Sequence, residues 1–130
     1  RDTVATFIDE VVENYPVDAS NVTLLGFSQG TILSYAVAFT YPEKIKNVIA
    51  LSGYLNQKIF EVSDSKDYSH LNFYCSHGSV DQVIPVEAAR LITPFMEMHN
   101  LNHVYEEYPV GHGVAPQNFY SFKTWLEKLM

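Results

Sequence analysis

The pentapeptide Gly26-Phe27-Ser28-Gln29-Gly30 constrains the fold of this chain more than any other stretch. It follows the short apolar run 22–25 and precedes a helical pattern that begins at residue 31, which predicts a strand, a sharp turn and a helix. A serine in such a G-x-S-x-G turn sits on a strained backbone, with its hydroxyl exposed at the carboxyl end of a sheet. We expect both glycines to be required, because side chains there would clash with the neighbouring strand and helix. On this motif alone, an ordinary turn closing a βα unit remains the alternative.

Length and composition indicate one domain over residues 1–130. The chain is 47% hydrophobic, which is ample for a packed core. Its formal net charge of −7 makes nucleic acid a poor partner and disfavours strongly anionic substrates. No run approaches the roughly 18 to 20 apolar residues of a membrane span, so we expect none. Because the one cysteine, Cys75, lies in an apolar run, we predict a buried, inert thiol. A single cysteine gives no disulfide framework, which fits a reducing, cytoplasmic compartment.

Hydrophobic spacing predicts an alternation of helices and strands. Helical spacing of apolar residues covers 2–15, 31–41, a segment that begins at Pro85, and 116–129. Short apolar runs predict strands at 22–27, 48–51, 71–76 and 103–108, with the first two buried on both faces. Pro94 should kink or break the third helix, and segment 54–69 should be a surface excursion near the site. The alternation predicts an α/β layered fold with a parallel sheet of about four strands.

Three of the four predicted strands are followed by side chains suited to nucleophilic catalysis. Ser28 follows the first strand, Asp81 the third, and His112 the fourth, where it lies between two glycines. Ligands bind at the carboxyl ends of strands in open α/β sheets, so we expect these side chains to meet there. Asp64 and Asp67, in the excursion after the second strand, are the alternative acids.

In this order the motifs resemble an α/β-hydrolase of the carboxylesterase/phospholipase type, the group that contains acyl-protein thioesterases and small bacterial esterases. The resemblance is carried by the pentapeptide, by the stretch from His77-Gly78 to Pro85 with its Asp81, and by Gly111-His112-Gly113-Val114. Together they bracket about 90 of the 130 residues. The resemblance implies a three-layer fold, a Ser28, His112 and Asp81 triad, and no metal or organic cofactor. It also implies hydrolysis of ester or thioester bonds through an acyl-serine.

In this interpretation His112 acts as general base and acid, and Asp81 fixes its tautomer. The backbone N–H of Gln29 would be one oxyanion donor. The family's second donor comes from a loop after an earlier strand, and nothing before Arg1 is available to supply it. We therefore expect the chain to be the C-terminal two thirds of a longer hydrolase. Its first strand would then present an unpaired apolar edge that pairs in a homodimer or with the missing N-terminal part.

Two alternatives to an esterase stay open, a serine peptidase of the same fold and a non-catalytic binding module that lacks the oxyanion loop. We expect a structural role for the remaining histidines, which are His70, His77, His99 and His103. For His77, orientation of the Asp81 loop is the alternative. Apolar and aromatic side chains next to the strand ends are candidate walls of the pocket for a small ester substrate: Phe27, Tyr54, Leu55, Phe60, Val83 and Val114.

Overall fold

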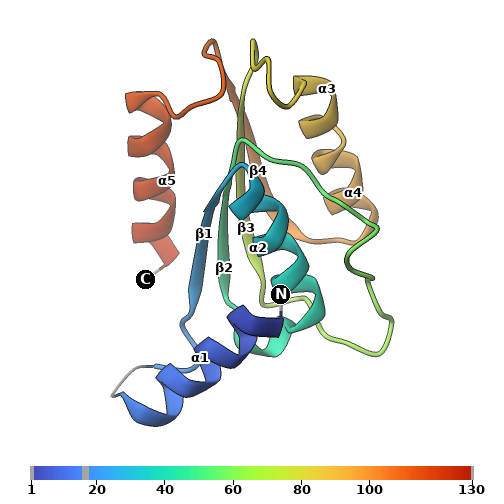
Figure 1. Cartoon of the computed structure of the whole chain (residues 1–130), viewed down its shortest axis with the longest axis vertical. Coiled ribbons are helices and arrows are strands. Elements are labelled where there is room, and N and C mark those ends of the chain that lie inside the picture. Colours follow the sequence, from blue (N-terminus) through green and yellow to red (C-terminus); the bar gives the residue numbers. More distant parts are fainter. Residues whose placement is uncertain (1, 16–17, 130) are drawn as a thin grey trace.

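The computed structural model describes residues 2–15 and 18–129, and it contains a parallel sheet of four strands between layers of helices (Figure 1). The strands lie side by side in chain order, β1 (Thr23–Phe27), β2 (Asn47–Leu51), β3 (Asn72–Gly78) and β4 (Asn102–Tyr108). In the register, Phe27 is opposite Leu51, Leu51 opposite Ser76, and Gly78 opposite Tyr108. The carboxyl ends of all four strands therefore meet at one edge of the sheet, as predicted.

Helices cover both faces of the sheet, which confirms the predicted layered α/β class. The helices are α1 (Asp2–Asn14), α2 (Gln29–Thr40), α3 (Val86–Ala89), α4 (Ile92–Met98) and α5 (Pro116–Leu129), with a 3-10 turn, η1 (Pro42–Lys44). Figure 1 shows α5 on one side of the sheet and α2, α3 and α4 on the other. Alternate side chains of β2 point to opposite faces of the sheet. Ile49 packs in a cluster with Phe122 of α5, whereas Val48 packs in a cluster with Phe39 of α2.

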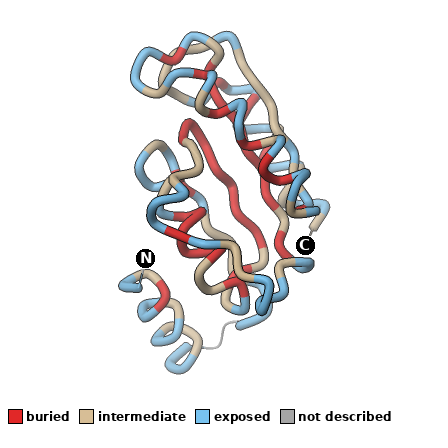
Figure 2. Tube along the Cα trace, turned by 90° about the vertical axis from the view of Figure 1, so that its right-hand side faces the viewer, coloured by how far each residue is buried: buried red, intermediate tan, exposed pale blue. Residues whose placement is uncertain are grey.

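Burial along the strands follows their position in the sheet. Every residue of β2 is buried, and Figure 2 shows the buried residues, in red, along the central strands. The prediction of burial on both faces is wrong for β1, where the side chains of Leu25 and Phe27 are 58% and 41% exposed. The reason is that these two side chains lie on the same face as their partners Ile49 and Leu51, which pack against Phe122 of α5, but they are not part of that cluster. The strand β1 is also the first of the sheet and, within residues 2–15 and 18–129, pairs with β2 alone. The predicted apolar edge is thereby confirmed.

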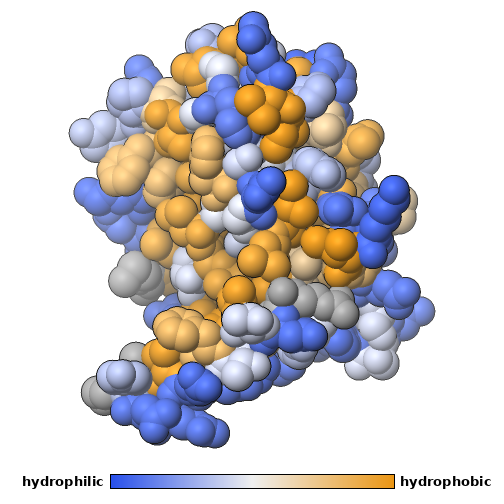
Figure 3. All heavy atoms as spheres, viewed as in Figure 1, coloured by the Kyte–Doolittle hydropathy of each residue, from blue (hydrophilic) through white to orange (hydrophobic). Residues whose placement is uncertain are grey.

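Apolar surface extends from β1 to the first helix. A groove of about 680 Å³ runs between α1 and β1, and its apolar lining includes Phe7, Ile8, Val11 and Leu24. Figure 3 shows further apolar side chains, in orange, over the centre of the face that Figure 1 presents. Among the described residues, no helix is both long enough and apolar enough to cross a membrane.

The helix predicted from Pro85 is interrupted, though not at Pro94. It is divided into α3 and α4, with the break at Arg90 and Leu91. Pro94 is the third residue of α4, where its missing N–H would have had no acceptor within the helix. The excursion after β2 forms no helix or strand from residue 53 to 71, as expected. Its Phe60 packs into the core, where the ring stacks on Phe39 with centroids 4.9 Å apart.

Candidate active site

Ser28 occupies the turn between β1 and α2 in a strained backbone conformation. Its φ of 56° and ψ of −113° lie where residues other than glycine are uncommon. Hydrogen bonds hold the turn, since Ser28 N–H donates to the carbonyl of Leu51 (2.9 Å) and its own carbonyl accepts from the N–H of Thr31 (3.1 Å). The strain is thus supported by the neighbouring strand and by the first turn of α2.

Thr31 is a supporting residue that the sequence analysis missed. It is 1% exposed, and its hydroxyl oxygen lies 2.7 Å from the carbonyl oxygen of Gly26 and 2.6 Å from that of Leu51. The hydroxyl therefore links α2 to the ends of β1 and β2 at the turn. The available signal was a hydroxyl-bearing residue three positions after the serine, in the first turn of a helix.

Only one of the two glycines in the pentapeptide is required by space. A Cβ on Gly26 would lie 2.5 Å from the carbonyl carbon of Gly30, whereas a Cβ on Gly30 would meet nothing within 4 Å. The expectation that both are needed is therefore wrong for Gly30, because the close approach is from the strand to the helix backbone and not the reverse.

Ser28, His112 and Asp81 lie in one hydrogen-bonded chain. His112 Nε2 is 2.9 Å from Ser28 Oγ, and His112 Nδ1 is 2.7 Å from Asp81 Oδ2. Because a carboxylate accepts, Nδ1 carries the hydrogen and Nε2 is left to accept from the serine hydroxyl. The structure therefore brings together the three residues that the strand ends predicted. Asp64 and Asp67 are instead exposed in the excursion.

Backbone donors fix the other oxygen of the Asp81 carboxylate. Asp81 Oδ1 accepts from the N–H groups of Val83 (2.8 Å) and Ile84 (2.9 Å), and the side chain is fully buried. Burial alone would raise the pKa of Asp81, but the hydrogen bonds from His112, Ile84 and Val83 favour the charged form and lower the pKa below its ordinary value. The carboxylate is therefore ionised and oriented at neutral pH.

This lowered pKa predicts that Asp81 makes the stability of the folded protein depend on pH. Since the pKa of Asp81 is lower in the folded state than in the unfolded state, its ionised form stabilises the fold. This stabilisation is complete above the unfolded pKa of about 3.9 and is lost as the pH falls through the folded-state pKa. We expect the difference in unfolding free energy between the wild type and Asp81→Asn to shrink from pH 6 to pH 3 in urea titrations. The acidic groups of Glu106 and Glu107, whose pKa values are also lowered, are present in both proteins and cancel. A difference that stays constant over this range would contradict the assignment.

The loop that carries His112 lies directly against the end of β3. A Cβ on Gly78 would be 2.1 Å from the carbonyl oxygen of Gly111 and 2.3 Å from that of Val110, so no side chain fits there. By contrast, a Cβ on Gly111 or Gly113 would meet nothing within 4 Å. The glycine that lets the two loops meet is therefore Gly78, and not those that flank the histidine.

Gly78→Ala is accordingly expected to lower the free energy of unfolding by about 3 kcal/mol, as overpacking against backbone does. Gly113→Ala is the control, and we expect it to change the free energy by less than about 0.5 kcal/mol. Urea unfolding of both variants measures the contrast. Equal effects of the two substitutions would mean that the close approach at Gly78 is not a constraint.

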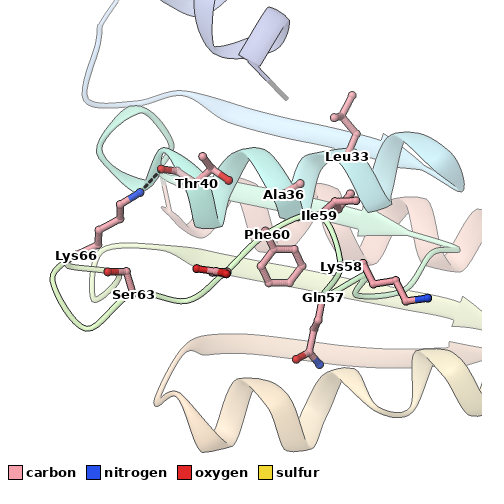
Figure 4. A pocket seen from close by; sticks show the side chains of 10 residues that line it. Leu33, Ala36, Thr40, Gln57, Lys58, Ile59, Phe60, Ser63 and Lys66 are labelled. Atoms are coloured by element: carbon pink, nitrogen blue, oxygen red, sulfur yellow. Dashed lines mark hydrogen bonds between the residues drawn. The ribbon is translucent and has the colours of Figure 1, made fainter.

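The candidate pocket walls lie in different surroundings. Phe27 lies beside His112, with ring centroids 4.9 Å apart, while Val83 and Val114 are exposed. Tyr54 and Leu55 are half-buried. Phe60 is buried and lines a groove of about 830 Å³ between α2 and segment 57–66, which is drawn in Figure 4. Residues that line this groove include Leu33, Ile59 and Lys66, and none of Ser28, Asp81 and His112 is among them.

Comparison with known proteins identifies the family. The model of the phospholipase/carboxylesterase family matches the chain over residues 1–130. The chain belongs to this family. It is 28% identical over 121 residues to a probable carboxylesterase of Oryza sativa subsp. japonica, a match that covers 91% of this chain and 44% of the relative. It is 29% identical over 140 aligned positions to acyl-protein thioesterase 1 of Aspergillus fumigatus, a match that covers 100% of this chain and 56% of the relative.

Solved structures share the fold of this phospholipase/carboxylesterase family member. The carboxylesterase of Bacillus cereus superposes with a TM-score of 0.87 at 17% identity, over 98% of this chain and 58% of that one. SOBER1 of Arabidopsis thaliana gives a TM-score of 0.81 at 22% identity, over 98% of this chain and 61% of SOBER1. The predicted α/β-hydrolase fold is thus confirmed. The chain spans about half the length of the curated relatives that it matches.

The remaining polar groups considered in this family member are the backbone N–H of Gln29 and three histidines. Gln29 is the first residue of α2, so its N–H has no acceptor within the helix and is a candidate oxyanion donor. Two of the histidines expected to be structural lie beside backbone carbonyls. His70 Nε2 is 2.6 Å from the carbonyl oxygen of Pro42, and His103 Nδ1 is 3.0 Å from that of Leu101. The ring of His99 packs on Phe95, with centroids 4.7 Å apart.

Proposed function

We propose that this protein hydrolyses carboxylic ester or thioester bonds through an acyl-Ser28 intermediate, in one domain that requires no metal or organic cofactor. The observation that carries the proposal is the hydrogen-bonded chain from the Ser28 hydroxyl through His112 to Asp81. Family membership supports the substrate class, as do the names of the carboxylesterase and thioesterase relatives. A peptidase of the same fold has no comparable support.

Each group has one role in the proposed reaction. His112 Nε2 takes the proton of Ser28 as Oγ attacks the carbonyl carbon, and the ionised Asp81 stabilises the imidazolium that forms. The Gln29 N–H donates to the oxyanion, His112 returns its proton to the departing alcohol or thiol, and the acyl group stays on Oγ. A water that loses its proton to His112 then attacks the acyl carbon, the bond to Ser28 Oγ breaks, and His112 returns the proton to Oγ as the acid leaves. Phe27, Tyr54, Leu55, Val83 and Val114 remain the proposed walls for the acyl or alcohol group.

A substrate panel tests this proposal. We expect turnover of a p-nitrophenyl ester and of an acyl thioester, and none of an aminoacyl amide. Preferential cleavage of the amide would favour the peptidase. If neither this chain nor the chain extended at its N-terminus acts on any of the three substrates, the binding module would be the better description.

We also propose that the edge of β1 is paired in the working protein, in a homodimer or by residues upstream of Arg1. The exposed Leu25 and Phe27 and the apolar groove beside α1 support this proposal. A monodisperse monomer in light scattering would remove the homodimer. We propose a cytoplasmic location, which fits a chain with a single cysteine. Cys75 is buried as predicted, and burial raises the pKa of its thiol to about 12, so the thiol is inert.

A further inference from the structure

His77 is a buried titratable side chain that the proposed reaction does not use. It is the penultimate residue of β3, and its side chain is 0% exposed. Its Nε2 lies 2.7 Å from the carbonyl oxygen of Ile84 and 3.3 Å from Asp81 Oδ2, whereas its Nδ1 is buried without a hydrogen-bond partner. A buried polar atom without a partner costs free energy, so its presence here needs an explanation.

The contacts of the ring define where its hydrogen lies. Both groups beside Nε2 are acceptors, one a carbonyl and the other a carboxylate, so Nε2 carries the hydrogen. Nδ1 has no acceptor beside it and carries no hydrogen. The whole polar function of His77 is therefore a single N–H donor at one position, aimed at the loop that carries Asp81.

That donor completes a closed arrangement of hydrogen bonds around Ile84. The N–H of Ile84 donates to Asp81 Oδ1 (2.9 Å), and its carbonyl accepts from His77 Nε2 (2.7 Å). The N–H and the carbonyl of Ile84 are thus both held, and Asp81 Oδ1 is directed toward the backbone. Only Oδ2 remains for His112, and the His77 donor lies within 3.3 Å of this oxygen as well.

We propose that His77 is a positioning residue that holds Asp81 Oδ2 in place for His112. The catalytic consequence rests on the proposed hydrolase function, but the effect on the Asp81 to His112 hydrogen bond does not. A residue that positions a catalytic group affects the rate, because a displacement of about 1 Å in the catalytic group can lower the rate about a hundredfold.

Three substitutions separate the donor from the bulk of the ring. His77→Gln places an amide N–H where Nε2 was, His77→Asn places its amide one methylene short of it, and His77→Leu keeps apolar bulk without a donor. In proton NMR we expect the wild type to show a far-downfield resonance of His112 Nδ1–H, assigned by its loss in Asp81→Asn. This resonance should persist in His77→Gln and disappear or shift in His77→Asn and His77→Leu.

Kinetics give the second arm of the test. We expect the kcat for a p-nitrophenyl ester to fall about 10- to 100-fold in His77→Asn and His77→Leu with little change in KM, and to stay within about threefold of the wild type in His77→Gln. If the leucine variant does not fold, the glutamine and asparagine pair carries the comparison. Equal behaviour of these two amides in the NMR spectrum overturns the inference. A wild type with the downfield resonance and no turnover would instead contradict the proposed function and leave the positioning role standing.

Discussion

Ser28→Ala is expected to lower kcat for ester hydrolysis by about 10⁶-fold, the size of effect seen when a serine nucleophile is removed. The substitution deletes the oxygen that lies 2.9 Å from His112 Nε2 and leaves the imidazole with no hydroxyl to deprotonate. Steady-state kinetics with a p-nitrophenyl ester measure the loss. The turn itself is held by backbone bonds and by Thr31, so circular dichroism and urea unfolding should show a folded protein.

Ser34→Ala is the matched control for this substitution. Ser34 lies in the same helix, and its hydroxyl donates to the carbonyl of Gly30 at 2.7 Å. Such a bond within a helix contributes little, so we expect kcat to stay within about twofold of the wild type. Residual activity of more than about 1% in a folded Ser28→Ala protein would contradict the nucleophile assignment, since the remaining groups supply much less.

Asp81→Asn is expected to lower kcat by about 10⁴-fold, through the tautomer of His112 and not through a loss of shape. The N–H groups of Val83 and Ile84 both donate to Oδ1, so the asparagine carbonyl takes that position and its NH₂ group turns toward His112. Nδ1 must then accept, the ring hydrogen moves to Nε2, and Nε2 no longer accepts from Ser28. Steady-state kinetics at pH 7 with an ester substrate measure the effect.

Asp64→Asn is the control for this second substitution. Asp64 is exposed in the excursion and was the alternative acid in the sequence, so its replacement should change kcat by less than about twofold. If Asp64→Asn lost activity and Asp81→Asn kept it, the acid would have been assigned to the wrong loop.

The residues that local pattern determines were predictable from the sequence. Short apolar runs and helical spacing placed β1 to β4 and α2, and the chain order of Ser28, Asp81 and His112 placed the candidate site at the carboxyl ends of the strands. These features depend on a few neighbouring residues and on the geometry of parallel sheets. The exposure of Leu25 and Phe27 was not predictable, because it depends on whether a helix covers that face of β1.

Contacts between distant segments account for the other differences. The need for glycine at Gly78 arises from the carbonyl oxygen of Gly111, which lies far along the chain. Gly78 belongs to the motif that carries Asp81, but nothing in that motif says which backbone atoms lie against it. Thr31 and His77 likewise act across elements, with their partners on β2 and in the loop after β3. The sequence signals were a hydroxyl three positions after Ser28 and a histidine four positions before Asp81, but spacing along a chain does not say which atoms these side chains contact.

An activated Ser28 is the central claim, and covalent labelling tests it most directly. The protein is treated with a fluorophosphonate, its intact mass is measured, and the adduct is mapped by peptide digestion. We predict one adduct per chain, located on Ser28, and no adduct on Ser28→Ala under the same conditions. An unmodified protein, or an adduct on another residue, under conditions that label a control hydrolase would contradict it.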